Sequence, residues 1–324
     1  MNIVIASYLS ESAHSICTLD AEHDLQAALK SIVDFYVAPQ QGLFTKDCLK
    51  DRALNYGDGC FTTMYGESDT IFLFEEHFQR LARDCQKLSI NVCLETVKQW
   101  LLLGLSIMIT KYHTAYAVKV VVSRGVGGRG YELPQHPSTS VVVSIFESNA
   151  IDSRKVQNDD YHYSVKRANM SLSSQPLLAG IKHLNRLEQV LAKRELMQYE
   201  CDDLILCDQK GLIIEATAAN IFYQKDGVWF TPEIINCGVR GVMRNAILTF
   251  FENEGLSYEI KQSPFTELLN ADTIFLCNAI KFIIPVSIIS VNHKTYRFDI
   301  SHASTLAGSL YDWVSMQQSV RLEE

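Results

Sequence analysis

The chain lacks the features that mark nucleic-acid-binding and membrane proteins. Its 29 Lys and Arg residues form no clustered basic run and are outnumbered by 37 Asp and Glu residues. The resulting net charge of −8 gives no electrostatic footprint for DNA or RNA. The longest apolar stretch, residues 100–110, is too short to cross a bilayer, and no basic segment precedes the partly apolar N-terminus as in a signal peptide. We therefore expect a cytoplasmic protein without nucleic-acid or membrane partners.

Paired cysteine motifs are also missing. Nine cysteines occur, and none of them forms a Cys-x-x-Cys pair. This odd set favours reduced thiols over a disulfide framework or a zinc site, so we expect no metal. Internal repeats and low-complexity segments are absent as well. With 47% apolar and 20% charged residues among 324, the composition is that of a globular protein long enough for two domains.

Patterning divides the chain into four parts. Residues 1–34 are an N-terminal extension of unknown role, in which residues 20–33 have the apolar spacing of a helix. Residues 35–148 predict a smaller α/β domain. The polar residues 149–160 are the expected linker, and residues 161–324 form a larger domain.

The smaller domain is expected to alternate strands and helices. Helical spacing covers residues 75–89 and 94–111. Valine-rich runs at 118–122 and 140–145 predict strands, with a glycine-rich loop between them. The expected fold class is therefore α/β (α+β) with two domains.

The most informative segment runs from Gly180 to Leu191. Lys182 stands at the entrance to a stretch that predicts an amphipathic helix. A desolvated lysine amine can hold a carbonyl cofactor as a Schiff base, although a lysine at a helix edge is more often a solvated surface charge. The apolar positions at helical spacing are Leu184, Leu187, Val190 and Leu191.

Two later segments supply what a pyridoxal ring and its phosphate need. Glu215 opens a stretch that predicts a tight turn running into a strand, and an acidic group can pair with the pyridine nitrogen. Residues 239–244 begin a helical pattern, and the first amides of a helix can bind phosphate. Together with Lys182, these segments make up most of a pyridoxal phosphate site.

Seven segments, in order along the chain, resemble the fold-type IV pyridoxal phosphate enzymes of the class IV aminotransferase family. They cover roughly residues 36–320, and seven ordered matches are far more specific than one. Within this group the chain is most similar to the aminodeoxychorismate lyases. The segments are residues 51–63, 77–81, 123–131, the Lys182 segment, the Glu215 segment, 277–279 and 284–286.

The resemblance implies roles for the cofactor-binding residues. Lys182 would form the internal aldimine with pyridoxal 5′-phosphate and move protons, and Glu215 would bind the pyridine nitrogen. Arg80 and the backbone amides of Val242 and Met243 would hold the phosphate. Without the family, Arg80 reads as part of an exposed helix face with i,i+4 charge pairs.

The resemblance also implies residues that support the site or face the substrate. Asn220 would support the turn after Glu215. Thr62 and Thr63 would face the substrate, and one of these hydroxyls is a hypothetical proton donor to the leaving group. Arg124 and Arg129 would bind the substrate. Both threonines are equally ordinary strand residues, and both arginines suit a plain glycine-rich turn.

The implied reaction converts 4-amino-4-deoxychorismate to 4-aminobenzoate and pyruvate in folate biosynthesis, through an aldimine, proton abstraction by Lys182 and elimination. The family places its active site between the two domains and closes it with the partner of a homodimer. A class IV aminotransferase acting on branched-chain or D-amino acids is the first alternative. A non-catalytic relative of the same fold is the second.

Overall fold

The computed structural model describes residues 2–9, 12–20, 48–108, 115–148, 161–317 and 319–321, and its contacts separate into two compact units. The first unit comprises Met1–Asn149, Lys182–Asn185 and Ser319–Glu324. The second comprises Ala150–Ile181 and Arg186–Gln318. The lysine segment therefore packs with the first unit, although most of the chain around it belongs to the second. The expected linker, residues 149–160, lies outside the described residues.

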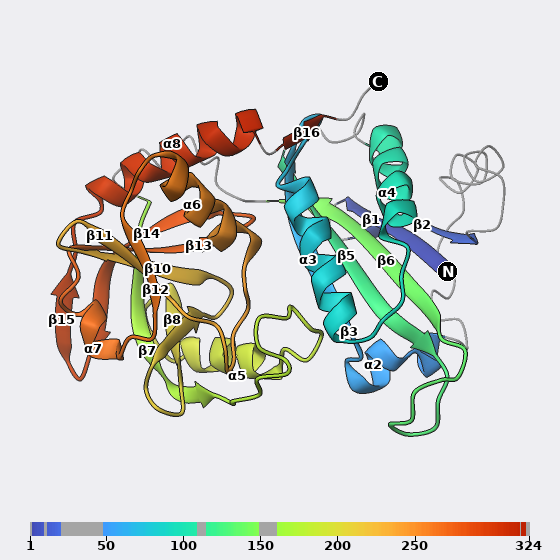
Figure 1. The fold of residues 1–324 in the computed structure, drawn as a ribbon, viewed down its shortest axis with the longest axis horizontal. Helices are drawn as coiled ribbons and strands as arrows, with labels where there is room; N and C mark the ends of the chain where they lie inside the picture. Colours follow the sequence, from blue (N-terminus) through green and yellow to red (C-terminus); the bar gives the residue numbers. More distant parts are fainter. Residues whose placement is uncertain are drawn as a thin grey trace. The chain divides into compact units, whose positions relative to one another are not determined.

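A seven-stranded sheet carries the described part of the first unit, in the order β16-β4-β3-β5-β6-β1-β2 (Figure 1). The long strands β3, β5 and β6 pair antiparallel, and the valine runs predicted as strands lie in β5 and β6. The strands are β1 (Asn2–Leu9), β2 (Ser12–Asp20), β3 (Gly59–Glu67), β4 (Thr70–Phe72), β5 (Ala115–Val126), β6 (Ser138–Glu147) and β16 (Ser319–Arg321).

The two helices expected in this unit are confirmed. They are α3 (Phe74–Lys87) and α4 (Leu94–Met108), and the remainder of the second predicted range, 109–111, is not described. The helix α3 packs against β3 (Figure 1). Its apolar positions recur every three or four residues, so they share one face, which is buried. That face consists of Phe74, Phe78, Leu81 and Cys85.

The first residues of the chain add a β-hairpin to the sheet. Strand β1 pairs parallel with β6, and β2 pairs antiparallel with β1 (Figure 1). Asp20 ends β2, so the helical pattern expected to start there is wrong at its first residue. The rest of that predicted helix, residues 21–33, lies outside the described residues. A short 3-10 turn, Cys48–Lys50, and the helix α2 (Arg52–Tyr56) lead into β3.

The second unit is built on a nine-stranded sheet among the described residues (Figure 1). Its order is β12-β11-β10-β13-β14-β7-β8-β9, and β15 pairs with β14. The strands are β7 (Tyr163–Leu172), β8 (Asp203–Asp208), β9 (Ile213–Ala216), β10 (Asn220–Lys225), β11 (Val228–Pro232), β12 (Tyr258–Lys261), β13 (Thr273–Asn278), β14 (Phe282–Val291) and β15 (Lys294–Arg297).

Both faces of this sheet are covered. Along β8, Leu204 and Leu206 belong to one apolar cluster while Ile205 and Cys207 belong to another, as the two-residue period of a strand requires. The helix α8 packs on β14 and β13 and meets α6 (Figure 1). No helix in the described part of the chain combines the length and apolarity of a bilayer crossing. The helices are α5 (Leu187–Leu196), α6 (Val242–Asn253), α7 (Phe265–Leu268) and α8 (Ser301–Gln317).

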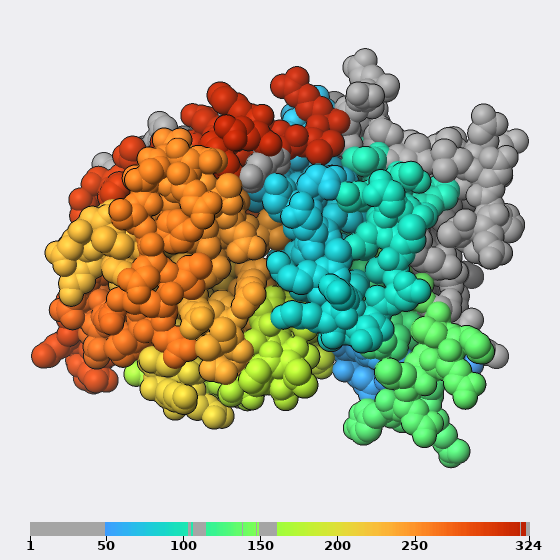
Figure 2. All heavy atoms as spheres, in the orientation of Figure 1, coloured from blue at the N-terminus to red at the C-terminus, as the bar shows by residue number. Residues whose placement is uncertain are grey.

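The helix predicted after Lys182 exists, but it starts later than expected and its apolar positions are exposed. The helix α5 begins at Leu187, so Leu184 lies before it. Leu187 and Val190 are 68% and 60% exposed, and Ala192 is the buried residue of the helix. Figure 2 shows this part of the chain at the surface of the molecule. The helical period was correct, but the stripe it marks does not face this chain's core.

Candidate functional site

The main chain of Lys182 is held from both sides within the first unit. Its N–H donates to the carboxylate of Asp84 on α3, at 3.1 Å. Its carbonyl accepts from the N–H of Phe61 on β3, at 2.9 Å. The half-buried Lys182 side chain places Nζ 4.8 Å from the centroid of the Phe61 ring. The lysine is therefore anchored to one helix and one strand, unlike an ordinary solvated surface lysine.

The residues after Lys182 extend this attachment. The N–H of Leu184 donates to the carbonyl of Gly59 at 3.0 Å, and Asn185 Nδ2 donates to the carbonyl of Gly57 at 3.0 Å. Gly57 has φ of 63°, and a Cβ there would lie 2.5 Å from Asn185 Oδ1. The left-handed backbone favours glycine at position 57, and a larger side chain there would displace the Asn185 amide from its hydrogen bond.

Arg80 lies in a buried polar cluster with Thr62 and His77. Arg80 Nη2 donates to Thr62 Oγ1, and Thr62 Oγ1 lies 2.5 Å from His77 Nδ1. Thr62 Oγ1 therefore joins the arginine and the histidine through its hydroxyl. Arg80 is 5% exposed. The interpretation of Arg80 as part of an exposed helix face is therefore wrong.

Burial keeps His77 neutral. Loss of solvation, followed by the positive charges of Arg80 and Lys182, holds the pKa of His77 well below its usual 6.5. Below about pH 6.5 the unfolded chain therefore binds a proton that the folded chain does not. By linkage, the free energy of unfolding falls with decreasing pH, by about 1.4 kcal/mol per pH unit from this group.

We expect His77→Asn to remove this slope. Denaturant unfolding followed between pH 7.5 and 5.5 should show a shallower decline of stability for the variant than for the parent, because asparagine gains no proton in this range. His136→Gln, at an exposed position, is the control and should keep the parental slope. If the free energy of unfolding fell with decreasing pH equally in His77→Asn and the parent, the assignment of His77 as a neutral buried group would be contradicted.

Thr62 and Thr63 point to opposite faces of the sheet, since they are neighbours on β3. Thr62 is fully buried in the cluster with Arg80. Thr63 is half-buried and shares its face with Phe61, whose ring lies beside Lys182 Nζ. The contact of either threonine with substrate stays a prediction.

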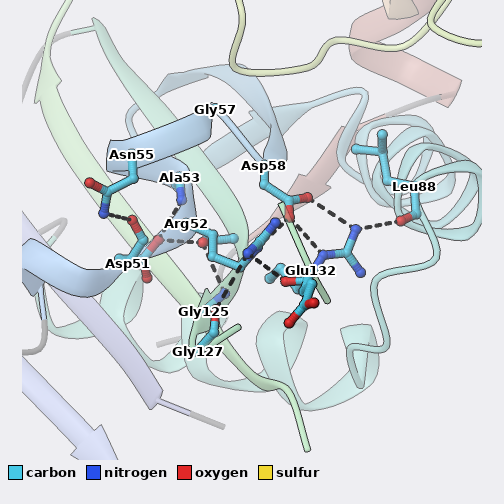
Figure 3. A network of polar contacts seen from close by, with 12 residues as sticks. Asp51, Arg52, Ala53, Asn55, Gly57, Asp58, Leu88, Gly125, Gly127 and Glu132 are labelled. Carbon is cyan, nitrogen blue, oxygen red and sulfur yellow. Dashed lines mark hydrogen bonds and ion pairs between the residues drawn. The ribbon is translucent and has the colours of Figure 1, made fainter. Parts of the chain in front are cut away.

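Arg124 is buried and forms an ion pair with Asp58, which is labelled in Figure 3. Its guanidinium donates to both carboxylate oxygens of Asp58, at 2.8 and 3.0 Å, and to the carbonyls of Leu88 and Ser89. Arg52 Nε donates to the same carboxylate at 2.8 Å. Burial alone would raise the pKa of Asp58, but the hydrogen bonds and charges of the two arginines hold it below its usual value. The network joins the end of α3 to the start of β3.

Arg52 extends this network to the glycine-rich loop (Figure 3). Its Nη1 donates to the carbonyls of Gly127, Gly130 and Glu132. Arg129 is exposed in the same loop. The structure therefore uses Arg124 in packing and leaves Arg129 at the surface, and substrate binding by either arginine stays a prediction.

Glu215 is buried near the end of β9 in the second unit. Its Oε2 accepts from the N–H of Val239 at 2.9 Å, and its Oε1 accepts from Gln189 Nε2 at 3.4 Å. The turn predicted after Glu215 is confirmed, because the N–H of Ala216 donates to the carbonyl of Ala219 before β10 begins. The carboxylate is thus fixed by the main chain that leads into α6.

Gly180 contacts the same main chain. Its N–H donates to the carbonyl of Gly238 at 2.9 Å, and its carbonyl accepts from the N–H of Arg240 at 3.2 Å. A side chain at Gly180 would be strained, because its φ is 83°. The chain reaches Lys182 two residues after this attachment.

The start of α6 suits an anion. Gly241 occupies the N-cap position in an extended conformation, and no described side chain caps this 12-residue helix. Asn220 Nδ2 donates to the carbonyl of Val239 at 2.9 Å, and a Cβ on Gly241 would lie 2.1 Å from Asn220 Oδ1. Asn220 therefore holds the main chain at the helix entry, where the amides of Val242 and Met243 follow.

The residues present fit pyridoxal 5′-phosphate. Lys182 offers an amine for its carbonyl group, and Glu215 offers a buried carboxylate for its ring nitrogen. In the first unit the buried guanidinium of Arg80 is a donor of the kind that binds phosphate, and in the second unit the uncapped end of α6 is another. The roles of these residues toward the cofactor stay predictions.

Sequence reasoning missed two carboxylates of the first unit, Asp58, which binds Arg52 and Arg124, and Asp84, which binds the Lys182 N–H. Asp58 lies within a recognised motif, and its neighbouring arginine at position 52 was a usable signal. Asp84 was read with Arg80 as an exposed helix face, yet both are buried. Nothing local marks Asp84, since its partner Lys182 is 98 residues away.

Known proteins similar to this chain agree with this chemistry. An aminodeoxychorismate lyase of Vibrio harveyi is 34% identical, covering 78% of this chain and 90% of the relative. A putative branched-chain-amino-acid aminotransferase of Methanocaldococcus jannaschii is 29% identical, and the match covers 73% of this chain and 80% of the relative. The solved structure of the 4-amino-4-deoxychorismate lyase of Pseudomonas aeruginosa matches with a TM-score of 0.73 and 31% identity. The match covers 86% of this chain and 96% of the lyase.

The match to a family model reaches across most of both units. The model for amino-transferase class IV matches residues 59–289, which include the segments that carry Arg80, Lys182, Glu215 and the start of α6. The chain therefore belongs to the class IV aminotransferase family, whose members depend on pyridoxal phosphate.

Proposed function

We propose that this chain is an aminodeoxychorismate lyase, which converts 4-amino-4-deoxychorismate to 4-aminobenzoate and pyruvate. The likeness to lyases above 30% identity, over more than three quarters of the chain, supports this reaction over transamination. The observation that carries it is the anchored Lys182, whose N–H and carbonyl are bound on opposite sides while its amine lies beside an aromatic ring. A lysine held in this way can remove a proton from a defined direction.

Pyridoxal phosphate, when bound, supplies the electron sink that makes the C–H bond next to the substrate amine acidic. Lys182 is the base that removes this proton. The C–O bond at the neighbouring carbon of the substrate ring then breaks, pyruvate leaves, and the substrate ring becomes aromatic. Because aromatisation makes the elimination strongly favourable, the protein must chiefly orient the substrate and supply the base.

The other cofactor ligands keep the roles expected from the sequence. Glu215 keeps the ring nitrogen protonated, which its burial supports because a carboxylate removed from water interacts more strongly with a cation. The amides of Val242 and Met243 and the guanidinium of Arg80 bind the phosphate. Asn220 holds the entry to α6 in place.

Of the two threonines, Thr63 is the better proton donor to the leaving group. It shares a strand face with Phe61, beside which the Lys182 amine lies. Thr62 is already hydrogen-bonded to His77 and accepts from Arg80, so its hydroxyl is occupied. The two-domain arrangement, with residues 1–34 as an extension and 149–160 as a linker, also belongs to this proposal.

A coupled assay tests the reaction. Purified protein supplied with pyridoxal phosphate is mixed with 4-amino-4-deoxychorismate, and pyruvate is followed with lactate dehydrogenase. Pyruvate release at the rate of 4-aminobenzoate formation is the expected result. Formation of pyridoxamine phosphate from branched-chain or D-amino acids, with no pyruvate, would instead assign the aminotransferase reaction.

We also propose that the protein is a cytoplasmic homodimer. Leu187, Val190 and Met197 are exposed within and just after α5, and apolar patches of this kind favour association. Leu187→Lys combined with Val190→Lys should halve the mass measured by light scattering after gel filtration. Met316→Lys, at an exposed apolar position on α8, is the control and should leave the mass unchanged. A parent protein of monomer mass would contradict the proposal.

A further inference from the structure

A buried carboxylate contacts the main chain of the catalytic lysine. Asp84 lies in the last turn of α3 and is 0% exposed. Its Oδ2 accepts the N–H of Lys182 at 3.1 Å. Burying a carboxylate is costly unless hydrogen bonds or cations compensate it. The hydrogen bond from Lys182 to Oδ2 therefore offsets part of the cost of burying this carboxylate.

Cations on the same helix explain why a carboxylate is tolerated here. Arg83 Nε lies 3.7 Å from Asp84 Oδ1, and Arg80 is one turn earlier on α3. Burial raises the pKa of Asp84, while the Lys182 N–H and the charges of Arg80, Arg83 and Lys87 oppose that rise. Asp84 is the negative partner in a group of positive side chains.

The hydrogen bond to Asp84 complements the one from β3. Phe61 binds the carbonyl of Lys182, and Asp84 binds its N–H. Together they fix both peptide planes that flank the lysine Cα, so the side chain leaves the main chain in one direction. Without the hydrogen bond to Asp84, fewer contacts restrain the φ angle of Lys182. Because the amine lies at the end of a four-carbon chain, a small change in φ moves it further than any other atom of the side chain.

We propose that Asp84 is a positioning residue, whose hydrogen bond to the Lys182 N–H orients the amine for proton transfer. This inference rests on the proposed role of Lys182 as the base. A base misplaced by about 1 Å loses on the order of 10²-fold in rate, whereas substrate binding is largely retained.

Two substitutions separate the hydrogen bond from the charge. In Asp84→Ala the acceptor is lost, and we expect the Lys182 amide to exchange with solvent deuterium at least about tenfold faster in the cofactor-free protein. With cofactor, kcat for pyruvate release should fall about 10- to 100-fold with KM within about threefold. Asp84→Asn keeps an oxygen acceptor, so it should restore slow exchange and most of kcat.

Glu75→Gln is the matched control, because it removes an exposed carboxylate from the same helix. Both exchange at Lys182 and kcat should remain at the parental values. If Asp84→Ala does not fold, Asp84→Leu is used instead as the variant without a hydrogen-bond acceptor.

Parental exchange at Lys182 or parental kcat in the acceptor-free variant would overturn the proposal. So would Asp84→Asn if it lost kcat as severely as alanine, because the charge would then be the feature that matters. The exchange measurement needs neither cofactor nor substrate. A parent protein that releases no pyruvate but shows the exchange difference would therefore reject the lyase reaction and leave the contact of Asp84 with Lys182 established.

Discussion

Lys182→Ala is expected to abolish pyruvate release, lowering kcat by about 10⁴-fold or more because both the cofactor attachment and the base are lost. The Lys182 main chain is fixed by Asp84 and Phe61, and its amine lies beside the Phe61 ring. Residual turnover near the parental rate would show that Lys182 is not the base.

The same variant has a spectroscopic consequence. The parent loaded with pyridoxal phosphate should absorb at about 400–430 nm, because the cofactor is attached through the lysine amine. Lys182→Ala should lack this band after dialysis. Lys210→Ala, at an exposed position after β8, is the control and should keep both the band and the rate. A band in Lys182→Ala that is lost on reduction with borohydride, with the cofactor then irreversibly attached to the protein, would place the attachment at another lysine.

Local periodicity predicted the elements whose apolar residues face this chain's own core. The helices α3 and α4 were found because their apolar residues repeat every three to four positions, and the strands β5 and β6 because their valine-rich runs favour strands. The start of α6 was found for a related reason, since Gly241 precedes a continuous helical pattern. In these segments the sequence pattern and the packing have the same cause.

The pattern misled where the apolar stripe does not face the core. Leu187 and Val190 repeat as in α3, but they are exposed. A period identifies a face of a helix without identifying what covers it. The converse error occurred on α3, where charged residues at i and i+4 suggested a solvated face. Arg80 and Asp84 are both buried, because each finds a polar partner in a distant segment.

The lysine segment depends on contacts that no local window contains. Asn185 binds Gly57 across 128 positions, and Arg124 binds Asp58 across 66. Residues 182–185 belong to the first unit although the residues on either side belong to the second. The chemistry of Lys182 and Glu215 was readable from residue type and resemblance. The contacts that orient Lys182 required the fold.

Glu215→Gln should lower kcat by about 10²-fold or more, because a neutral amide does not hold a proton on the pyridine nitrogen and the ring becomes a poorer electron sink. The substitution is nearly isosteric. The glutamine carbonyl oxygen can still accept from the N–H of Val239, so the connection between β9 and the entry to α6 is kept. The melting temperature should therefore change little while the rate falls.

A fall in kcat without a fall in melting temperature would distinguish a chemical role of Glu215 from a packing role. Glu215→Ala removes the acceptor for Val239 as well, so it should lower both kcat and the melting temperature, since a buried N–H without a partner costs about 1–3 kcal/mol. Glu254→Gln, exposed at the end of α6, is the control and should keep parental values of both. If Glu215→Gln retained the parental kcat, the buried carboxylate would serve only to hold Val239, and the ring nitrogen would need another acid.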